Sequence, residues 1–511
     1  MDVLLNWILR GVYLAIGVGA GIWIARWLTE ARRGAEERWP LRVAIGMLVL
    51  AGVYAVGHAR LLAQREEIDE GRLRYARYGD PRRAELRRAE VRGWILGCQD
   101  GPEGALALYR ARDGVVERHY PLGAAGANLI GGGEDADERD YTVEQLFADR
   151  LRAPASLLER GELHPAGTDL ALTLCAEPTA TAWDLLRRSG RQGAVVVQDV
   201  RTGALVAYAA TGGPDQPPLG IQEYAAPGSV FKLALAAVWW ENGLPDTEMS
   251  CQSEIRITPR ATIRNSEGFS IPQVSVPHEM LVYSCNTTAV QMAMTMRERL
   301  GEEAFAEAYR RFGFLPYTDD PPRGFQTDFW DTRSEAWARR MSPPPARLRI
   351  GEGTGPAEWG QLAIGQGPID ATPIHVSRFL QAIGNAGVML HPAIEREVAE
   401  DDREGTRVMS EETALRLMRS MRAVVDRGTA RRALPILQGL SWDLGGKTGT
   451  AQVAGAADNG WFAGIVFDPD DRPRYSVVVF LEGGGPGGRT PTEIAARMTR
   501  VLAASAPEEA R

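Results

Sequence analysis

Lysine is almost absent from this sequence. Of 58 basic residues in a chain of 511, only Lys232 and Lys447 are lysines, and all the others are arginines. A lysine needed only for charge or solubility could be replaced by arginine. A proton acceptor could not be, because arginine stays protonated in proteins whereas a buried lysine can become neutral. A need for proton transfer would therefore explain at least one of the two lysines.

Cysteine and histidine are also scarce. The four cysteines show no Cys-x-x-Cys spacing, and the six histidines are scattered without a His-Glu-x-x-His pattern. A zinc site is therefore not expected, and no cofactor is predicted. The net charge of −8 and the lack of alternating basic and aromatic residues also argue against a nucleic-acid partner.

The length of the chain predicts two or three domains rather than a single core. We expect a membrane anchor over residues 1–60 and a small β-rich pedestal or linker domain over 61–165. The part from 60 to 92 is rich in arginine and glutamate at helical spacing and is expected to be a solvated helix. A large α/β domain is predicted over 166–505.

The predicted anchor rests on two apolar runs, 3–25 and 43–57, which would form one or two transmembrane helices. The loop between them carries five arginines against three glutamates, so the positive-inside rule places it in the cytoplasm. The large domain is then extracytoplasmic (periplasmic), and the chain is expected in the cytoplasmic (inner) membrane. A cleaved signal peptide is the alternative, although no small-residue cleavage site follows the first run.

Strand-like runs occur at both ends of the large domain and predict one antiparallel sheet flanked by helices. The middle, 229–440, is expected to be mostly helical and to form an all-helical subdomain, with 315–360 as an inserted loop. The expected strands are 193–199, 204–210, 446–454, 461–467 and 475–482; the expected helices are 230–240, 286–299, 373–386, 411–425 and 491–505.

Both lysines lie in short motifs suited to nucleophilic catalysis. Ser229 follows Gly228 and precedes a helix-forming run, so it is expected at a helix N-terminus, where free amides favour a developing anion. Lys232 lies three residues later on the same helical face, within reach of the serine hydroxyl. Lys447 begins a strand that could run beside this helix, and its charge would lower the pKa of Lys232.

Two further motifs complete the candidate site. Ser284 and Asn286 lie two residues apart and could face the same cleft. The stretch Lys447, Thr448, Gly449, Thr450 supplies a lysine followed by two hydroxyls. A phosphate-binding loop is the alternative for this stretch, but that motif requires glycine where Ser441 stands.

In this order the motifs resemble those of the penicillin-binding protein and serine β-lactamase superfamily: Ser-x-x-Lys, Ser-x-Asn and Lys-Thr-Gly. Over 168–505 the chain is similar to the transpeptidase domain of class B penicillin-binding proteins, and residues 92–95 and 120–123 resemble pieces of the class B pedestal. The family-like stretches are Ala-Ala-Pro-Gly-Ser at 225–229, Ser-Cys-Asn-Thr at 284–287, Ala-Ile-Gly-Gln-Gly at 363–367, Ala-Thr-Pro at 371–373, Val-Val-Asp-Arg-Gly-Thr-Ala at 424–430 and Gly-Lys-Thr-Gly-Thr-Ala-Gln at 446–452.

The resemblance implies the penicillin-binding transpeptidase fold and a peptidoglycan D,D-transpeptidase that forms a serine acyl-enzyme. Ser229 would attack the penultimate D-alanine of a stem peptide, with Lys232 as the base. Ser284 would relay a proton to the leaving amine. The backbone amides of Ser229 and Thr450 would form the oxyanion hole.

The resemblance also implies the substrate contacts and the partners. Asn286 would hold the substrate amide, and Lys447, Thr448 and Thr450 would hold the terminal carboxylate, with Gly449 in the same binding strand. The implied partners are stem peptides ending in D-Ala-D-Ala, β-lactams, the cytoplasmic membrane and a membrane-embedded peptidoglycan glycosyltransferase.

Two other functions remain open from the sequence. A membrane-anchored β-lactamase or β-lactam sensor would share the fold, and a catalytically dispensable scaffold for a glycan polymerase would not need the chemistry. The sequence also leaves a disulfide between Cys251 and Cys285 undecided, because it gives no distance between them.

Overall fold

The protein is described from a computed structural model. The described residues are 46–47, 92–112, 115–132, 141–152, 167–212, 216–316, 328–350 and 353–506. Nearly all of the predicted anchor and of the helix expected over 60–92 therefore lie outside them. Within the described residues, no helix is both long and apolar enough to cross a bilayer. Glu90–Arg511 forms one compact unit, and the predicted boundary at 165/166 stays a prediction.

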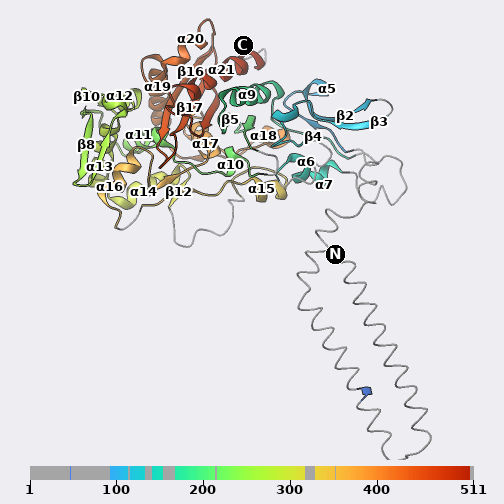
Figure 1. The fold of residues 1–511 in the computed structure, drawn as a ribbon, viewed down its shortest axis with the longest axis horizontal. Helices are drawn as coiled ribbons and strands as arrows, with labels where there is room; N and C mark the ends of the chain where they lie inside the picture. The colour runs from blue at the N-terminus through green and yellow to red at the C-terminus, as the bar shows by residue number, and fades with distance from the viewer. Residues whose placement is uncertain are drawn as a thin grey trace, which may run out of the picture. The chain divides into compact units, whose positions relative to one another are not determined.

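A five-stranded antiparallel sheet is the centre of this unit, and Figure 1 labels its strands β5, β16 and β17. The strand order is β16-β17-β18-β5-β6. Strands from both ends of the large domain meet where β18 pairs with β5, as the sequence predicted. The bounds are β5 (Gly193–Asp199), β6 (Leu205–Ala210), β16 (Asp443–Ala451), β17 (Asn459–Phe467) and β18 (Pro473–Leu481).

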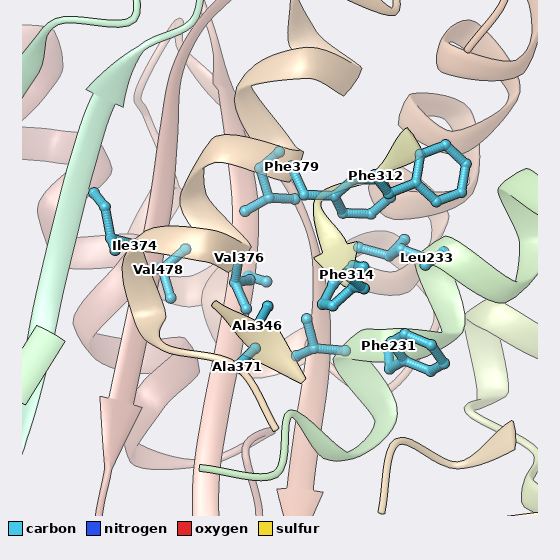
Figure 2. Packing of buried hydrophobic residues seen from close by; sticks show 14 of the residues in the cluster. Phe231, Leu233, Phe312, Phe314, Ala346, Ala371, Ile374, Val376, Phe379 and Val478 are labelled. Carbon is cyan, nitrogen blue, oxygen red and sulfur yellow. The ribbon is translucent and has the colours of Figure 1, made fainter. Parts of the chain in front are cut away.

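Alternate residues of each strand point to opposite faces of the sheet. Both faces are buried, each by its own layer of helices. On one face Val477 and Val479 pack in a core shared with α9 (Ala176–Ser189) and α21 (Thr490–Ser505). On the other face Val478 packs in the core that contains Ile374 and Val376 of α17 (Pro373–Gly384) (Figure 2). The sheet is thus held rigidly between two helical layers.

Helices fill much of the region between β6 and β16. They are α11 (Lys232–Glu241), α12 (His278–Tyr283), α13 (Asn286–Leu300), α14 (Glu302–Arg311), α17 and α19 (Glu411–Asp426). Of these, α11, α13, α17 and α19 lie where the apolar spacing predicted, whereas α12 and α14 were not predicted.

Two predictions for this region are wrong. The subdomain is not all helical, because residues 247–276 form two antiparallel ribbons. The expected inserted loop at 315–360 contains regular elements within its described parts, and its Trp330 and Trp337 are buried. The ribbons pair β7 (Thr247–Cys251) with β10 (Ile271–Val276) and β8 (Glu254–Thr258) with β9 (Ala261–Arg264); the other elements are α15 (Glu335–Met341), β12 (Ala346–Leu348) and α16 (Pro356–Ala363).

The N-terminal part of the unit is a small sheet, with the order β3-β2-β1-β4, packed beside short helices. Its buried polar centre is Glu144, whose carboxylate pairs with Arg92 at 3.0 Å and Arg118 at 2.7 Å. A disulfide between Cys98 and Cys175 ties this part to the segment before α9. The bounds are β1 (Ile95–Leu96), β2 (Ala105–Arg112), β3 (Val115–His119) and β4 (Leu170–Ala171).

Candidate active site

The three motifs converge on one cleft of about 760 Å³. Ser229 comes from a 3-10 turn, Gly228–Phe231, that leads directly into α11. Ser284 and Asn286 come from the junction between α12 and α13, and the third motif lies in β16. The motif residues that line the cleft are Ser229, Ser284, Asn286, Thr448 and Thr450.

Glycine at position 228 allows the turn that carries Ser229 to lie against β16. Gly228 has a φ of +55°, and a Cβ there would lie only 2.5 Å from the carbonyl oxygen of Thr450. Its N–H donates to the carbonyl of Gly365 at 2.9 Å. A side chain at this position would both strain the backbone and push the turn away from the strand. The close packing of this turn against β16 thus explains why glycine precedes Ser229.

Lys232 is fully buried beneath the cleft, and its amine binds the second motif. The Nζ atom donates to the carbonyl oxygen of Ser284 at 2.8 Å and to Oδ1 of Asn286 at 2.7 Å, and it lies 3.4 Å from Oγ of Ser284. Ser284 itself is in the left-handed region, with a φ of +56°. This uncommon conformation presents both its carbonyl and its hydroxyl to the lysine.

Lys447 approaches the same hydroxyl from β16. Its Nζ donates to Oγ of Ser284 at 2.8 Å and to the carbonyl oxygen of Thr448 at 2.9 Å. Lys447 is also fully buried, and neither lysine forms an ion pair with a carboxylate of the described residues. Two amines without a counter-ion therefore meet at one serine hydroxyl.

Burial without a counter-ion lowers the pKa of both amines. Desolvation is the larger cause for Lys232, whose pKa falls well below its usual 10.5, and the charge of Lys447 lowers it further, as the sequence predicted. Desolvation lowers the pKa of Lys447 to about 7. The site thus favours a neutral Lys232 beside a Lys447 that can still carry charge near neutral pH.

The expected contact between Ser229 and Lys232 is not a hydrogen bond in this structure. Within the described residues, Oγ of Ser229 has no hydrogen-bond partner, and the amine of Lys232 is directed to Ser284 and Asn286 instead. The helical spacing places the serine and the lysine on the same side of the turn, but it cannot show which acceptors the lysine amine binds. Such contacts often tighten only when substrate binds.

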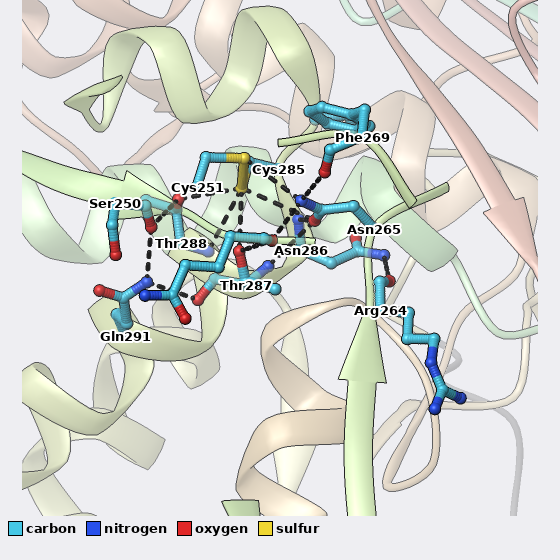
Figure 3. The surroundings of a disulfide bond; sticks show 12 residues. Ser250, Cys251, Arg264, Asn265, Phe269, Cys285, Asn286, Thr287, Thr288 and Gln291 are labelled. Carbon is cyan, nitrogen blue, oxygen red and sulfur yellow. Dashed lines mark hydrogen bonds between the residues drawn. A yellow bond between two sulfur atoms is a disulfide. The ribbon is translucent and has the colours of Figure 1, made fainter. Parts of the chain in front are cut away.

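Asn265 is a supporting residue that the sequence did not indicate. Its side chain is buried at the end of β9, and its Oδ1 accepts from the backbone N–H of Asn286 at 2.8 Å and of Thr287 at 3.3 Å. Its Nδ2 donates to the carbonyls of Gln252 at 2.7 Å and Phe269 at 2.9 Å (Figure 3). Asn265 therefore fixes the loop of Ser284 and Asn286 against the ribbons.

A disulfide between Cys251 and Cys285 fixes the same loop covalently (Figure 3). Cys285 stands between Ser284 and Asn286, and its sulfur accepts from the backbone N–H of Thr288 as the N-cap of α13. The pairing that the sequence left undecided is therefore formed in the structure. Spacing alone could not reveal it, because β7 and α13 come together only in the folded chain.

Thr429 lies in the family-like stretch 424–430 but outside the three motifs. Its hydroxyl lies 2.7 Å from that of Thr448, and both residues line the cleft. On the same strand, Oγ1 of Thr450 accepts from the backbone N–H of Gly487 at 3.4 Å. The hydroxyls of the third motif are thus held in place from two sides of the cleft.

The lowered pKa of Lys447 predicts how stability depends on pH. The unfolded chain binds this proton up to about pH 10.5, whereas the folded chain releases it near pH 7. Between these values the unfolded state binds more protons, so stability rises with pH, by at most about 1.4 kcal/mol per pH unit for one group. Lys232 adds to the rise. In urea unfolding from pH 7 to 10, Lys447→Met should show a smaller slope than the wild type; an unchanged slope would refute the shift.

Asn265→Ala should loosen the loop that carries Ser284 and Asn286. Removing the bridge leaves the backbone N–H groups of Asn286 and Thr287 without their acceptor and should cost about 1–3 kcal/mol of stability. The rate of covalent labelling by penicillin, the reaction that the family resemblance implies, should fall by about tenfold or more. Ser253→Ala is the matched control, because Ser253 is exposed on the neighbouring ribbon segment and does not line the cleft. Equal labelling rates in the two variants would show that Asn265 does not position the motif.

Comparisons with known proteins agree with the geometry. The family model "Penicillin binding protein transpeptidase domain" matches residues 193–500. The penicillin-binding protein PbpB of Mycolicibacterium smegmatis is 30% identical over 288 residues, which are 51% of this chain and 40% of that protein. The probable peptidoglycan D,D-transpeptidase PenA of Neisseria meningitidis is 23% identical over 417 residues, 72% of this chain and 64% of that protein. The chain thus spans less than two thirds of either relative.

Solved structures share the fold. PBPA from Mycobacterium tuberculosis matches with a TM-score of 0.63 at 20% identity, over 81% of this chain and 99% of that one. Pseudomonas aeruginosa PBP2, in complex with WCK 5153, matches with a TM-score of 0.62 at 20% identity, over 83% and 98%. The penicillin-binding transpeptidase fold predicted from the motifs is therefore confirmed. With the family model covering more than half of its residues, this chain belongs to the penicillin-binding protein transpeptidase family.

Proposed function

We propose that this protein is a peptidoglycan D,D-transpeptidase that works through an acyl-enzyme on Ser229. The observation that carries the proposal is the meeting of two buried amines at the hydroxyl of Ser284, directly beneath a cleft that exposes Ser229. Membership of the transpeptidase family supports the same reaction. One relative is named a probable peptidoglycan D,D-transpeptidase, and one structural neighbour is a penicillin G acyl-enzyme complex.

Lys232 is the proposed base for acylation. A neutral amine has two N–H donors and one lone pair. The carbonyl of Ser284 and Oδ1 of Asn286 accept the two donors at 2.8 Å and 2.7 Å, so the lone pair is left to take the proton of Ser229. As Oγ of Ser229 attacks the carbonyl of the penultimate D-alanine, the proton passes to Lys232. The backbone amides of Ser229 and Thr450 stabilise the oxyanion in this scheme.

Ser284 is the proposed relay to the leaving amine. Its hydroxyl accepts from Lys447 at 2.8 Å and lies 3.4 Å from Lys232. In the tetrahedral intermediate Lys232 carries the proton, and the hydroxyl can receive it while giving its own to the departing D-alanine, which completes acylation. An amine of a second stem peptide then attacks the acyl carbonyl, its proton returns through Ser284 and Lys232 to Oγ of Ser229, and the acyl group passes to that amine. This order of transfers leaves each residue in its starting protonation state.

Lys447, Thr448 and Thr450 are proposed to hold the terminal carboxylate of the donor peptide. The two threonines line the cleft, and Lys447 lies buried behind them. An anion at this position would raise the pKa of Lys447 from about 7, so binding itself charges the amine. Gly449 brings the strand close to the nucleophile turn, since a Cβ there would lie 3.0 Å from the carbonyl of Pro227.

The location and the partners are also proposals. The apolar runs 3–25 and 43–57 support a membrane anchor, and the arginines between them support an extracytoplasmic catalytic domain. Stem peptides and β-lactams are the proposed ligands of the cleft. A membrane-embedded peptidoglycan glycosyltransferase is the proposed protein partner, because a cross-linking enzyme acts on glycan strands that another enzyme must polymerise.

Fluorescent penicillin tests the proposed function. The folded wild type should become covalently labelled and stay labelled after free penicillin is removed, whereas Ser229→Ala should not be labelled. Ser229 is only partly buried, so the alanine variant should keep the fold, as circular dichroism can check. Rapid loss of the label would indicate a β-lactamase, and absence of label on the folded wild type would exclude the proposed chemistry.

Replacing each lysine by arginine separates their roles. Lys232→Arg should abolish labelling, because arginine cannot become neutral. Lys447→Arg keeps a charge, so it should label with a rate reduced by about ten- to a hundredfold, as the larger head group disturbs the contact to Ser284. Stopped-flow acylation of the two variants checks this division. Equal rates would contradict it.

A further inference from the structure

A second cavity of about 190 Å³ lies apart from the cleft and shares no lining residue with it. Its walls come from the end of α14, the segment at 328–329, the first turns of α17, and the chain around β14 (Val388–Met389). Nothing in the proposed reaction uses these residues. The lining residues are Phe312, Gly313, Asp328, Phe329, His375, Arg378, Met389 and His391.

Arg378 brings a positive charge into this cavity. The side chain is mostly buried, and its Nε donates to the carbonyl of Leu390 at 3.0 Å. Its guanidinium lies over the ring of Phe329, 5.1 Å from the centroid, and 3.4 Å from Nδ1 of His391. Within the described part of the chain it forms no ion pair, since Asp331 pairs with Arg403 at 2.7 Å. An arginine buried without a direct ion pair is costly even with the more distant charges of Asp328 and Asp331, so an anion here would be stabilised.

His375 adds an unused donor to the same cavity. It is 6% exposed, and burial lowers its pKa to about 3, so the ring is neutral. The backbone N–H of Thr372, which can only donate, points to Nδ1 at 3.4 Å, and the hydroxyl of Thr372 lies 2.8 Å from it. Nδ1 is therefore the acceptor and Nε2 carries the proton. Nε2 is buried and has no partner among the described residues.

The remaining walls indicate what kind of anion fits. Phe312, Phe329 and Met389 are buried and apolar, which suits a short hydrocarbon group. The exposed carboxylate of Asp328 also lines the cavity and would repel a doubly charged ion such as phosphate more than a singly charged one. The described residues hold no cluster of three metal-ligating side chains, so a metal is not the expected occupant.

We propose that this cavity is a binding site for a small monocarboxylate. The carboxylate accepts hydrogen bonds from Arg378 and from Nε2–H of His375, and its short apolar group packs against Phe312, Phe329 and Met389. The volume of about 190 Å³ accommodates ions of the size of acetate to butyrate. The site is independent of the reaction at Ser229, so it can be occupied while the cleft is occupied.

The test uses trifluoroacetate as the probe and the complete 511-residue chain in detergent. Because the proposed cleft also binds carboxylates, Ser229 is first acylated with penicillin to block it. The fluorine resonance of trifluoroacetate should then broaden saturably as protein is added, and propionate should displace the probe at lower concentration than inorganic phosphate. Binding that disappears on acylation, or that phosphate reverses as well as propionate does, would overturn the proposal.

Two variants distinguish the cavity from other surfaces. Arg378→Gln should weaken probe binding by at least about tenfold, because a charged hydrogen-bond donor is lost, while penicillin labelling stays at the wild-type rate. Asp328→Asn should tighten binding by about threefold, because a repelling charge is removed. Asp328 is exposed, so this variant should fold normally, and damage to the fold could not produce tighter binding. Unchanged affinity in both variants would refute the site.

Discussion

The site depends on two buried amines that share one hydroxyl without a carboxylate to balance them. Lys232 and Lys447 are each fully buried, and both lie near Oγ of Ser284. Water would keep both amines charged, whereas burial makes the doubly charged state costly. The pair can therefore hold one charge and one lone pair side by side. The proposed reaction uses both: the lone pair accepts the proton of the nucleophile, and the charge binds the anionic substrate.

The surrounding fold keeps these amines in place. The strand β16, which holds Lys447, is buried on both faces. The helix α11, which begins at Lys232, is buried along most of its length. Ser284 is held between them in a left-handed conformation by the helix junction, by Asn265 and by the disulfide of Cys285. Each of these constraints acts on the backbone. The side chains therefore need little rearrangement when substrate enters.

Much of the fold could be predicted because its signals are local. The strands of the central sheet were found within a few residues of their observed bounds, since near-continuous apolar runs are typical of strands buried on both faces. The lysines were found because arginine had replaced lysine everywhere else. The ribbons at 247–276 were missed, as their strands are short and partly exposed and carry a weak pattern.

What the sequence could not predict depends on long-range contacts. Asn265 matters because β9 passes beside the start of α13, and an isolated asparagine gives no sign of this. The bonding of Lys232 to Asn286, rather than to Ser229, depends on the position of α13. The cavity at His375 and Arg378 requires four separate segments to meet. In each case the residue types are ordinary, and only their arrangement carries information.

Locating the penicillin adduct by mass spectrometry tests the central claim most directly. The folded wild-type chain would be incubated with penicillin G, digested, and its peptides sequenced by fragmentation. We predict one adduct, on Ser229, with Ser284 unmodified although its hydroxyl contacts both lysines. An adduct on Ser284, or on a residue outside the cleft, would contradict the assignment of nucleophile and relay.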